Sequence, residues 1–325
     1  MRTYFDCIPC LLRQTVDTTR IVTRDPALQE RILRGALEEL ARADLMQPPP
    51  VQARRIHKLI REQGNHPDPY RDIKSRFNTL ALHVADDFRR RIADAPQPFE
   101  LALRIAIAAN IIDFGVGGAV EERQLHDAIE HALAASFDID DAIHRFEERL
   151  RRAGRILYLA DNAGEIAFDR LFIEQFSDRH DVTVAVKGGP VINDATLADA
   201  EQVGLTERVK VIDNGTDAPG TVLADCGPAF REAFYSADLI ISKGQGNFET
   251  LSDQPGNIVF LLKAKCPMVA RHLGSSIGDI VIRFAGEDAM PGSIHGAAVA
   301  APPDERQQAG YGKTTEKRDN NDYAG

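Results

Sequence analysis

The chain has 325 residues, of which 43% are hydrophobic and 27% are charged, as is ordinary for a globular protein of about two domains. Its formal net charge of -10, without a basic stripe, argues against a nucleic-acid partner, although a small anion can still bind in a local pocket. No run of residues approaches the roughly 20 apolar positions that span a bilayer, so no membrane association is expected.

Cysteine usage bears on the compartment and on one possible metal site. The four cysteines are too few for a disulfide scaffold, and the first residues lack the apolar core of a signal peptide, so a cytoplasmic location is expected. Cys7 and Cys10 have the spacing of a zinc or redox pair, but a structural zinc site needs four ligands and no second pair follows. We therefore favour packing of both thiols in the core over metal binding.

Residues 1–150 are predicted to form a helical domain. Apolar side chains recur at three- and four-residue spacing, as in Leu28, Ile32, Leu33, Leu37 and Leu40. Prolines 48–50 interrupt the pattern, as is typical between helices. Two polar features also stand out in this half.

The first polar feature is the series Tyr70, Lys74 and Asn78, which shares one helix face and either meets solvent or closes over a crevice of the second half. The second is the break at Asn110 and Asp113, with several glycines after it. We interpret that break as a capped, kinked helix end.

Residues 151–285 are predicted to form a Rossmann-like layer, because short β-rich runs alternate with helical runs as in βαβ units with a mostly parallel sheet. Residues 286–325 contain almost no large apolar side chains and are expected to be a disordered tail. The expected strands are Ile156–Ala160, Asp181–Val186, Val209–Ile212, Ala237–Ser242, Ile258–Leu262 and Ile280–Ile282.

Polar side chains follow four of these strands. Asp161 and Asn162 follow the first, and Lys187 with Asp194 follows the second. Asp, Asn, Lys and Gly also follow the third and fourth strands. Because the carboxyl ends of parallel strands open into one crevice, these side chains are expected to converge there. Acidic metal ligands would then lie beside lysines suited to an anion.

Asp161 and Asn162 taken alone are typical of a helix cap. Asp194 adds a second carboxylate, and two carboxylates with an amide form an oxygen-only ligand set suited to Mg²⁺ or Mn²⁺ and tolerant of Co²⁺ or Ni²⁺. We therefore favour a divalent metal site on Asp161, Asn162 and Asp194. Glu165, one helical turn later, is either an outer support of that site or a first-turn glutamate favoured by the helix dipole.

Lys187 and Lys243 each precede a glycine at a predicted strand end, where backbone amides can also hold an anion. A surface lysine before a turn is equally ordinary, so only the repetition favours a phosphate site. The Gly244-x-Gly246 element lacks the third glycine of a dinucleotide fingerprint, and no Walker sequence occurs, so NAD and ATP use are not supported. Gly-x-Ser-x-Gly is also absent, which argues against acyl-enzyme chemistry.

Three segments, Asp161–Glu165, Lys187–Asp194 and Ser242–Glu249, look like the successive signatures of one family. This is the domain of unknown function 89 family, the damage-control phosphatases with a metal-binding domain like that of acidic residue methyltransferase 1. The resemblance covers about Tyr4 to Phe284, and the motifs are specific in combination. Further segments resemble its prokaryotic branch, namely Cys7–Cys10, Asp68–Tyr70 with Lys74, Asn110–Gly115 and Lys265–Pro267.

The resemblance implies a helical N-terminal domain packed on a Rossmann-like αβα sandwich, with a divalent metal held between them. Carried over by motif, Asp161, Asn162 and Asp194 would be the metal ligands, and Lys243 would meet the substrate phosphate. Family members are metal-dependent phosphatases of sugar phosphates and related damaged or surplus phosphometabolites, and a carboxyl methyltransferase activity has been proposed for some. Our substrate-binding assignments are Lys187, Gly244, Asn247, Glu249 and Lys74.

We expect hydrolysis of a small phosphomonoester with Asp161 and Lys243 as catalytic residues. The nucleophile is either a metal-activated water or the Asp161 carboxylate. Two other functions stay open. One is methyl transfer from S-adenosylmethionine to a carboxylate, although no glycine-rich cofactor loop follows the first strand. The other is a non-catalytic metal or phosphometabolite sensor in which Cys7 and Cys10 report redox state.

Overall fold

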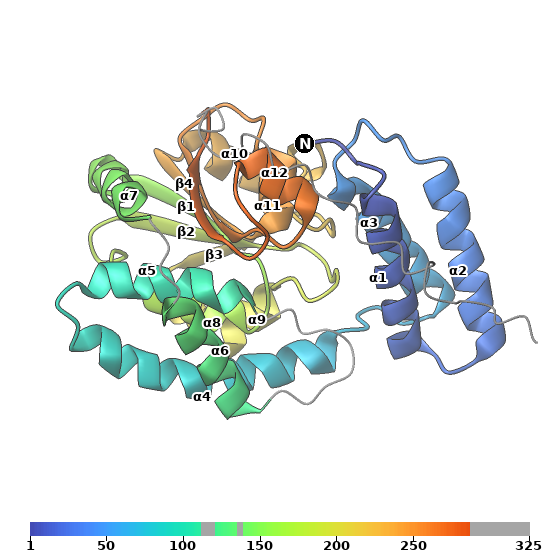
Figure 1. Cartoon of the computed structure of the whole chain (residues 1–325), viewed down its shortest axis with the longest axis horizontal. Helices are drawn as coiled ribbons and strands as arrows, with labels where there is room; N and C mark the ends of the chain where they lie inside the picture. Colours follow the sequence, from blue (N-terminus) through green and yellow to red (C-terminus); the bar gives the residue numbers. More distant parts are fainter. Residues whose placement is uncertain (112–120, 135–138, 287–325) are drawn as a thin grey trace, which may run out of the picture. The chain divides into compact units, whose positions relative to one another are not determined.

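The computed structural model describes residues 1–111, 121–134 and 139–286 (Figure 1). Apart from Gly286, the predicted tail lies outside these residues, as do Asp113 and the glycines after it. The helices before the sheet are α1 (Cys7–Val22), α2 (Pro26–Ala41), α3 (Pro49–Gln63), α4 (Arg71–Ala93), α5 (Pro98–Ala108), η1 (Ala109–Ile111), α6 (Glu122–Ala134) and α7 (Asp140–Arg152). Those between and after the strands are α8 (Glu165–Ile173), α9 (Leu197–Gln202), η2 (Leu205–Glu207), η3 (Leu223–Asp225), α10 (Pro228–Ser236), α11 (Gln245–Leu251) and α12 (Pro267–Leu273).

A six-stranded sheet forms the second half of the described chain, in the order β3-β2-β1-β4-β5-β6. The first five strands are parallel, and β6 is antiparallel to β5. This confirms the predicted α/β fold with a mostly parallel sheet, and the strand order reverses between β1 and β4. The strands are β1 (Arg155–Leu159), β2 (Asp181–Val186), β3 (Lys210–Asp213), β4 (Leu239–Lys243), β5 (Ile258–Lys263) and β6 (Ile280–Phe284).

Both faces of the sheet are covered by helices. Side chains alternate along each strand, so Tyr158 and its register partner Ile241 pack in one core cluster with residues of α4 to α8. Leu157 and Ile240 pack on the other face with residues of α10, α11 and α12. The result is a three-layer αβα sandwich in which near-continuous apolar strands are buried on both faces (Figure 1).

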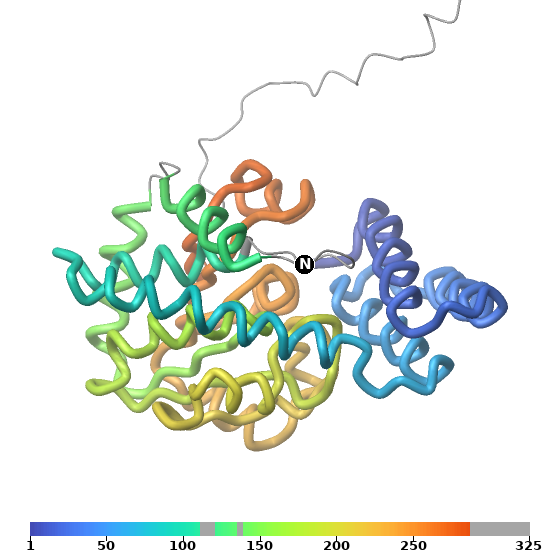
Figure 2. The backbone as a smooth tube through the Cα atoms, turned by 90° about the horizontal axis from the view of Figure 1, so that it is seen from below, coloured from blue at the N-terminus to red at the C-terminus, as the bar shows by residue number. Residues whose placement is uncertain are grey.

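Helices α1, α2 and α3 form a bundle with a core of its own. Its buried apolar side chains make a cluster separate from the two that cover the sheet, whereas α4 to α7 share a cluster with the strands. Figures 1 and 2 show the bundle beside the sheet region, with the start of α4 leading from one to the other. The predicted limits 1–150 and 151–285 remain predictions, although the last helix before the sheet ends at Arg152 and β1 begins at Arg155.

Local chemistry explains several helix boundaries. The Asp25 side chain accepts a hydrogen bond of 3.0 Å from the backbone of Ala27, and Pro26 begins α2. Gly274 ends α12 in the left-handed conformation. At the start of α1, Cys7 is half-buried but Cys10 is exposed, so core packing is wrong for Cys10. The buried residues of α1 are Leu11, Thr15, Thr18 and Thr19, so Cys10 lies on a face of the helix that points away from the bundle core.

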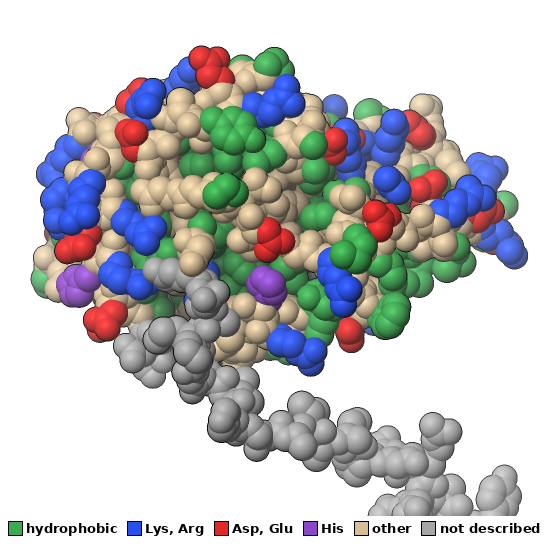
Figure 3. Space-filling view, turned by 90° about the horizontal axis from the view of Figure 1, so that it is seen from above, with side chains coloured by type: hydrophobic (Ala, Val, Ile, Leu, Met, Phe, Trp, Pro, Cys, Tyr) green, Lys and Arg blue, Asp and Glu red, His purple; other side chains and the backbone are tan. Residues whose placement is uncertain are grey.

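The surface agrees with the composition. On the face shown in Figure 3, basic and acidic side chains of the described residues are interspersed. Among the helices of residues 1–111, 121–134 and 139–286, none is both long and apolar enough to cross a membrane. The cytoplasmic location and the absence of a nucleic-acid partner stay predictions.

Candidate functional site

The loops after β1, β2 and β4 meet at the carboxyl edge of the sheet, beside the reversal of strand order. An isolated antiparallel bridge joins Asn162 to Asp194, and the Ala195 backbone donates a 2.9 Å hydrogen bond to the Asp161 carbonyl. The three residues assigned to the metal are therefore brought together, although the two loops are far apart in the sequence. This edge is where ligands bind in open α/β sheets.

Only glycine fits at position 244, because its backbone lies against the Asp161 carboxylate. Its φ is +79°, and an added Cβ would lie 1.9 Å from Asp161 Oδ2. A side chain there would be strained and would occupy the volume of the carboxylate. Gly244 thus leaves the space that the Asp161 carboxylate occupies, and this steric role is separate from the substrate contact assigned to it.

The Asp161 carboxylate is held by two amides. Asn110 and Asn162 donate to its Oδ2 at 2.9 and 2.7 Å, and the same two amides donate to Glu165 Oε2 at 2.7 and 3.1 Å. Asn110 lies in the short helix η1, which directly follows α5, so the predicted helix end is present. The buried side chain of Asn110, however, belongs to the site. Sequence reasoning missed that role.

Negative charge accumulates around Asp161. Burial raises the pKa of its carboxyl to about 7, with further contributions from Glu165 and Asp194, against the lowering effect of Lys265 and Lys187. Burial also raises the pKa of Asp194, although Lys187 opposes this shift. Asp194 Oδ2 is buried and has no hydrogen-bond partner among the described residues. A positive charge between these carboxylates would relieve both effects.

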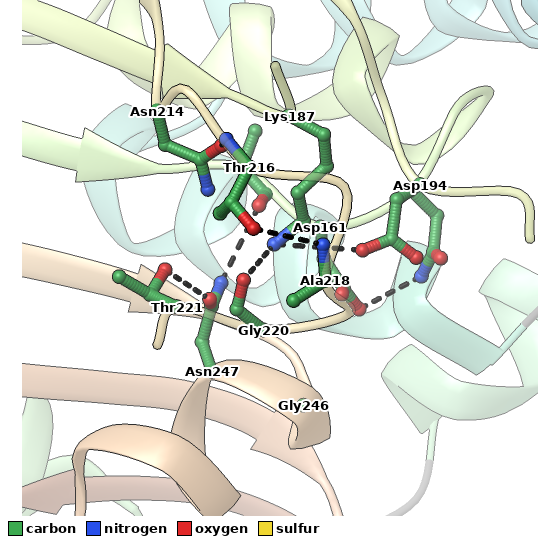
Figure 4. A network of polar contacts seen from close by, with 12 residues as sticks. Asp161, Lys187, Asp194, Asn214, Thr216, Ala218, Gly220, Thr221, Gly246 and Asn247 are labelled. Carbon is green, nitrogen blue, oxygen red and sulfur yellow. Dashed lines mark hydrogen bonds and ion pairs between the residues drawn. The ribbon is translucent and has the colours of Figure 1, made fainter. Parts of the chain in front are cut away.

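Lys187 supplies part of that charge from the end of β2. Its Nζ lies 3.5 Å from Asp194 Oδ2, an ion pair without a hydrogen bond, and donates to the carbonyl of Gly220 (Figure 4). Gly220 has a φ of +70°, and an added Cβ would lie 2.2 Å from the Gly246 carbonyl oxygen. The lysine is therefore held between the Asp194 loop and a glycine-dependent loop that follows β3.

Lys243 points from β4 toward α5 and α8. Its fully buried ammonium donates to Ala106 O at 3.0 Å, to Glu165 Oε1 at 2.6 Å and to Asp169 Oδ1. Burial alone would lower the pKa of Lys243, but the two carboxylates outweigh it and raise the pKa. Three acceptors thus occupy the ammonium, and its contact with a substrate phosphate stays a prediction.

The predicted face of α4 is buried against the site. Lys74 Nζ lies 3.3 Å from both Asp68 Oδ2 and Asp199 Oδ2. Asn78 accepts a hydrogen bond of 2.7 Å from the backbone of Gly164, in the Asp161 loop. Of the two alternatives for this face, the structure supports closure over the crevice. A pocket of about 480 Å³ beside it is lined by, among others, Asp68, Arg71, Lys74, Lys187, Gly188 and Asp199.

Three assigned substrate-binding residues, Gly244, Asn247 and Glu249, are not among the described residues that line this pocket. Asn247 is fully buried, accepts from Thr221 Oγ1 at 2.8 Å and donates to the Lys243 carbonyl at 2.8 Å, so it ties loops together. Glu249 is buried and hydrogen-bonded to Gln245 at 2.8 Å. Substrate contacts of Asn247 and Glu249 stay predictions.

Other site residues were missed by sequence reasoning. Asp169 follows Glu165 by one helical turn, so a second acid on the same helix face was visible. Asp199 stands three residues after Thr196, and the two form a capping box whose pattern can be read in the sequence. Gly220 has no such signal, because its contact with Lys187 joins positions 33 residues apart.

Comparisons with known proteins give a consistent result. Residues 3–281 match the damage-control phosphatase ARMT1-like domain. A damage-control phosphatase of Pyrococcus horikoshii is 39% identical over 286 residues, which cover 86% of this chain and 97% of that protein. A damage-control phosphatase of Archaeoglobus fulgidus is 34% identical, with 85% and 97% covered. The crystal structure of a DUF89 family protein from Pyrococcus horikoshii has a TM-score of 0.81 at 37% identity, covering 88% of this chain and 99% of that chain.

Proposed function

Because the chain belongs to the damage-control phosphatase family with an ARMT1-like domain, we propose that it is a metal-dependent hydrolase of small phosphomonoesters, such as sugar phosphates or related damaged phosphometabolites. The relatives support a phosphatase role in general. The finer statement rests on one observation. The buried carboxylates of Asp161 and Asp194 converge at the sheet edge. The cationic group paired with them in the described residues is Lys187, whose Nζ lies 3.5 Å from Asp194 Oδ2, so their negative charge is only partly neutralised.

The side chains present fit a hard divalent cation. Asp194 Oδ2 and Asn110 Oδ1 are buried and have no hydrogen-bond partner within the described part of the chain. In that same part, no three His, Cys, Asp or Glu side chains form a ready metal cluster. The amide oxygen of Asn162 would therefore have to join the carboxylates of Asp161 and Asp194. Such an oxygen set suits Mg²⁺, Mn²⁺, Co²⁺ or Ni²⁺ without selecting strongly among them.

Asp161, Asn162 and Asp194 would hold this cation, which when bound supplies Lewis-acid charge at a phosphoryl oxygen. The chain's own residues position the substrate. Lys187 neutralises phosphate charge from beside Asp194, where its ammonium is already directed by Gly220. The pocket lined by Lys74 and Lys187 receives the organic part of the substrate.

The buried Lys243 acts through Glu165. It bonds one carboxylate oxygen of Glu165, and the other oxygen holds the Asn110 and Asn162 amides that also bind Asp161. Lys243 thereby keeps Asp161 oriented. In this proposal it is a positioning residue, and a direct contact with the phosphate remains the alternative. Attack on phosphorus comes from a water or from the Asp161 carboxylate, and trapping an aspartyl-phosphate would identify the latter.

The test is release of inorganic phosphate by metal-stripped protein, with sugar phosphates and an aryl phosphate as substrates and each of the four cations added in turn. We expect cation-dependent release that Asp161→Asn abolishes. Asp181→Asn is the matched control, because Asp181 is exposed at the opposite end of β2. No release with any cation from folded protein, or full release by Asp161→Asn, contradicts the proposal.

A further inference from the structure

A charged clamp joins the α1–α3 bundle to the loops beside Lys187. Arg54 and Arg61 lie on α3 at a spacing of seven residues, which places them on one face of the helix. Outside the bundle, that face meets the loop between β3 and α10 and the turn at Pro190. The bundle's apolar residues pack in their own cluster, so polar contacts carry much of this junction.

Asp217 is the centre of the clamp. Arg54 Nε donates to its Oδ1 at 2.6 Å, and Arg61 Nη2 donates to its Oδ2, so each arginine holds one carboxylate oxygen. Arg54 also donates to Asp225 Oδ2 at 2.8 Å, and Arg61 to the Pro190 carbonyl at 2.8 Å. Each arginine thus binds two partners, which fixes direction as well as distance.

Asp217, at the centre of the clamp, stays ionised at neutral pH. Burial alone would raise the pKa of Asp217, but hydrogen bonds and charge from Arg54 and Arg61 outweigh it and lower the pKa. The side chains of Asp217 and Arg61 are 21% and 14% exposed, so water screens the pair only in part. Such pairs hold geometry better than fully exposed ones.

The loop that carries Asp217 is bonded to the turn after Lys187. The Gly188 backbone donates to Thr216 O at 2.9 Å and to Asn214 Oδ1 at 3.0 Å. Three residues after Asp217, Gly220 presents the carbonyl that accepts from Lys187 Nζ. A shift of this loop therefore moves the acceptor that directs the lysine.

We propose that Asp217 is a positioning residue, through which Arg54 and Arg61 of the helical bundle set the place of the Lys187 ammonium beside Asp194. This inference rests on the proposed phosphatase function for its catalytic consequence. Its structural content, that the clamp holds the loop and the lysine, stands apart from activity. The bundle then contributes to the site without touching substrate.

The first measurement is acetylation of Lys187 by acetic anhydride, followed by mass spectrometry. Lys187 is 2% exposed in the ion pair with Asp194, so it should react slowly in the intact protein. Arg61→Met and Asp217→Asn should raise its labelling rate about tenfold or more, since a loosened loop exposes the amine. Arg55→Met, which alters an exposed arginine of the same helix outside the clamp, should leave the rate unchanged. Unchanged labelling in Asp217→Asn overturns the inference.

The second measurement is kcat/KM with an aryl phosphate. Arg61→Met and Asp217→Asn should each lower it by about 10- to 100-fold, the range for misplacement by about 1 Å. The double variant should lose less than the product of the two single losses, because Arg61 acts in part through that carboxylate. Mn²⁺ affinity should stay within about twofold, because Asp161 and Asp194 are untouched; this separates a positioning role from loss of the fold.

The outcomes distinguish the two proposals. Faster labelling with unchanged kcat/KM would show that the clamp holds the loop but does not serve catalysis, which also overturns the positioning role. If the wild-type protein releases no phosphate, the proposed function fails, and labelling still decides whether Asp217 positions Lys187.

Discussion

Two buried charge clusters lie next to each other at the carboxyl edge of the sheet, and each contains one ammonium and two carboxylates. The inner cluster consists of Lys243, Glu165 and Asp169, and the outer cluster of Lys187, Asp161 and Asp194. In the inner cluster the ammonium bonds directly to both carboxylates. In the outer cluster the ammonium of Lys187 lies 3.5 Å from the Asp194 carboxylate and donates its hydrogen bond to the carbonyl of Gly220.

The two clusters therefore differ in how completely their lysine neutralises the carboxylates. In the inner cluster, Lys243 bonds both carboxylates directly and Tyr158 also donates to Asp169 Oδ1 at 2.7 Å, which leaves Asp169 Oδ2 buried without a hydrogen-bond partner among the described residues. The outer cluster leaves Asp194 Oδ2 without a hydrogen-bond partner inside the described residues, and the pKa of Asp161 is raised to about 7 by burial and by neighbouring acids. Equal formal charge therefore gives one cluster closed by direct ion pairs and one cluster whose loosely paired carboxylates are suited to a cation.

The largest effect is expected when one carboxylate of the outer cluster is neutralised. Asp161→Asn should abolish cation-dependent phosphate release, because a charged carboxylate ligand is replaced by a neutral amide that binds the cation more weakly. It should not lower the unfolding midpoint of the metal-free protein, because a buried carboxylate near Glu165 and Asp194 is removed. Asp169→Asn, in the inner cluster, should lower that midpoint by removing a partner of Lys243. Equal stability changes in the two variants would remove the distinction.

A smaller but still large loss of activity is expected from Gly244→Ala. The new methyl group would overlap the Asp161 carboxylate, and the residue would keep an unfavourable φ of +79°. We expect kcat/KM to fall by about 100-fold through misplacement of that carboxylate. Gly278→Ala is the matched control: its φ is +100°, and an added Cβ meets nothing within 4 Å among the described residues. If both variants behave alike, backbone strain alone explains the effect.

Lys243→Met tests the inner cluster through stability. It leaves Glu165 and Asp169 buried without their ammonium, so the free energy of unfolding in urea should fall by about 3–5 kcal/mol. Lys187→Met should cost less stability and more turnover, because Lys187 is bonded to a carbonyl and paired loosely. Wild-type stability with lost activity in Lys243→Met would instead favour the direct phosphate contact predicted from the sequence.

The sequence predicts the sheet better than it predicts which cluster each lysine joins. Strands β1, β2, β4 and β5 are apolar runs that stay largely buried, and the edge strands β3 and β6 are only partly buried but are also β-rich runs, so all six could be located within a few residues. The polar strand ends predicted that Asp161 and Asp194 converge. Lys243, however, lies on the same face of the sheet as Ile241, two residues earlier. Its side chain therefore enters the layer formed by α4 to α8. That direction depends on which sheet face α5 and α8 cover, a tertiary fact that spacing does not encode.

The smallest effect concerns a buried carboxyl group outside both clusters. Burial raises the pKa of Glu249 from 4.5 to about 7. A hydrogen bond from Gln245 and the charge of the Met1 α-amino group lower this pKa but do not outweigh burial. Because the folded state keeps this proton between pH 4.5 and 7 while the unfolded state loses it, stability falls as pH rises through that window and levels off above it. The loss should total about 3 kcal/mol, because a tenfold change in proton affinity corresponds to about 1.36 kcal/mol.

Glu249→Gln should remove this slope and make the variant more stable than wild type at pH 8, because the amide cannot ionise and can still accept from Gln245. Urea unfolding at pH 5, 6, 7 and 8 measures the difference, with Glu38→Gln as control, since Glu38 is exposed on α2. A slope that persists in Glu249→Gln would assign the titration to another group. Glu249, a buried acid without a lysine partner, thus stays protonated up to a pH of about 7. The acids of the inner cluster are instead paired directly with an ammonium, and those of the outer cluster are placed to bind a cation.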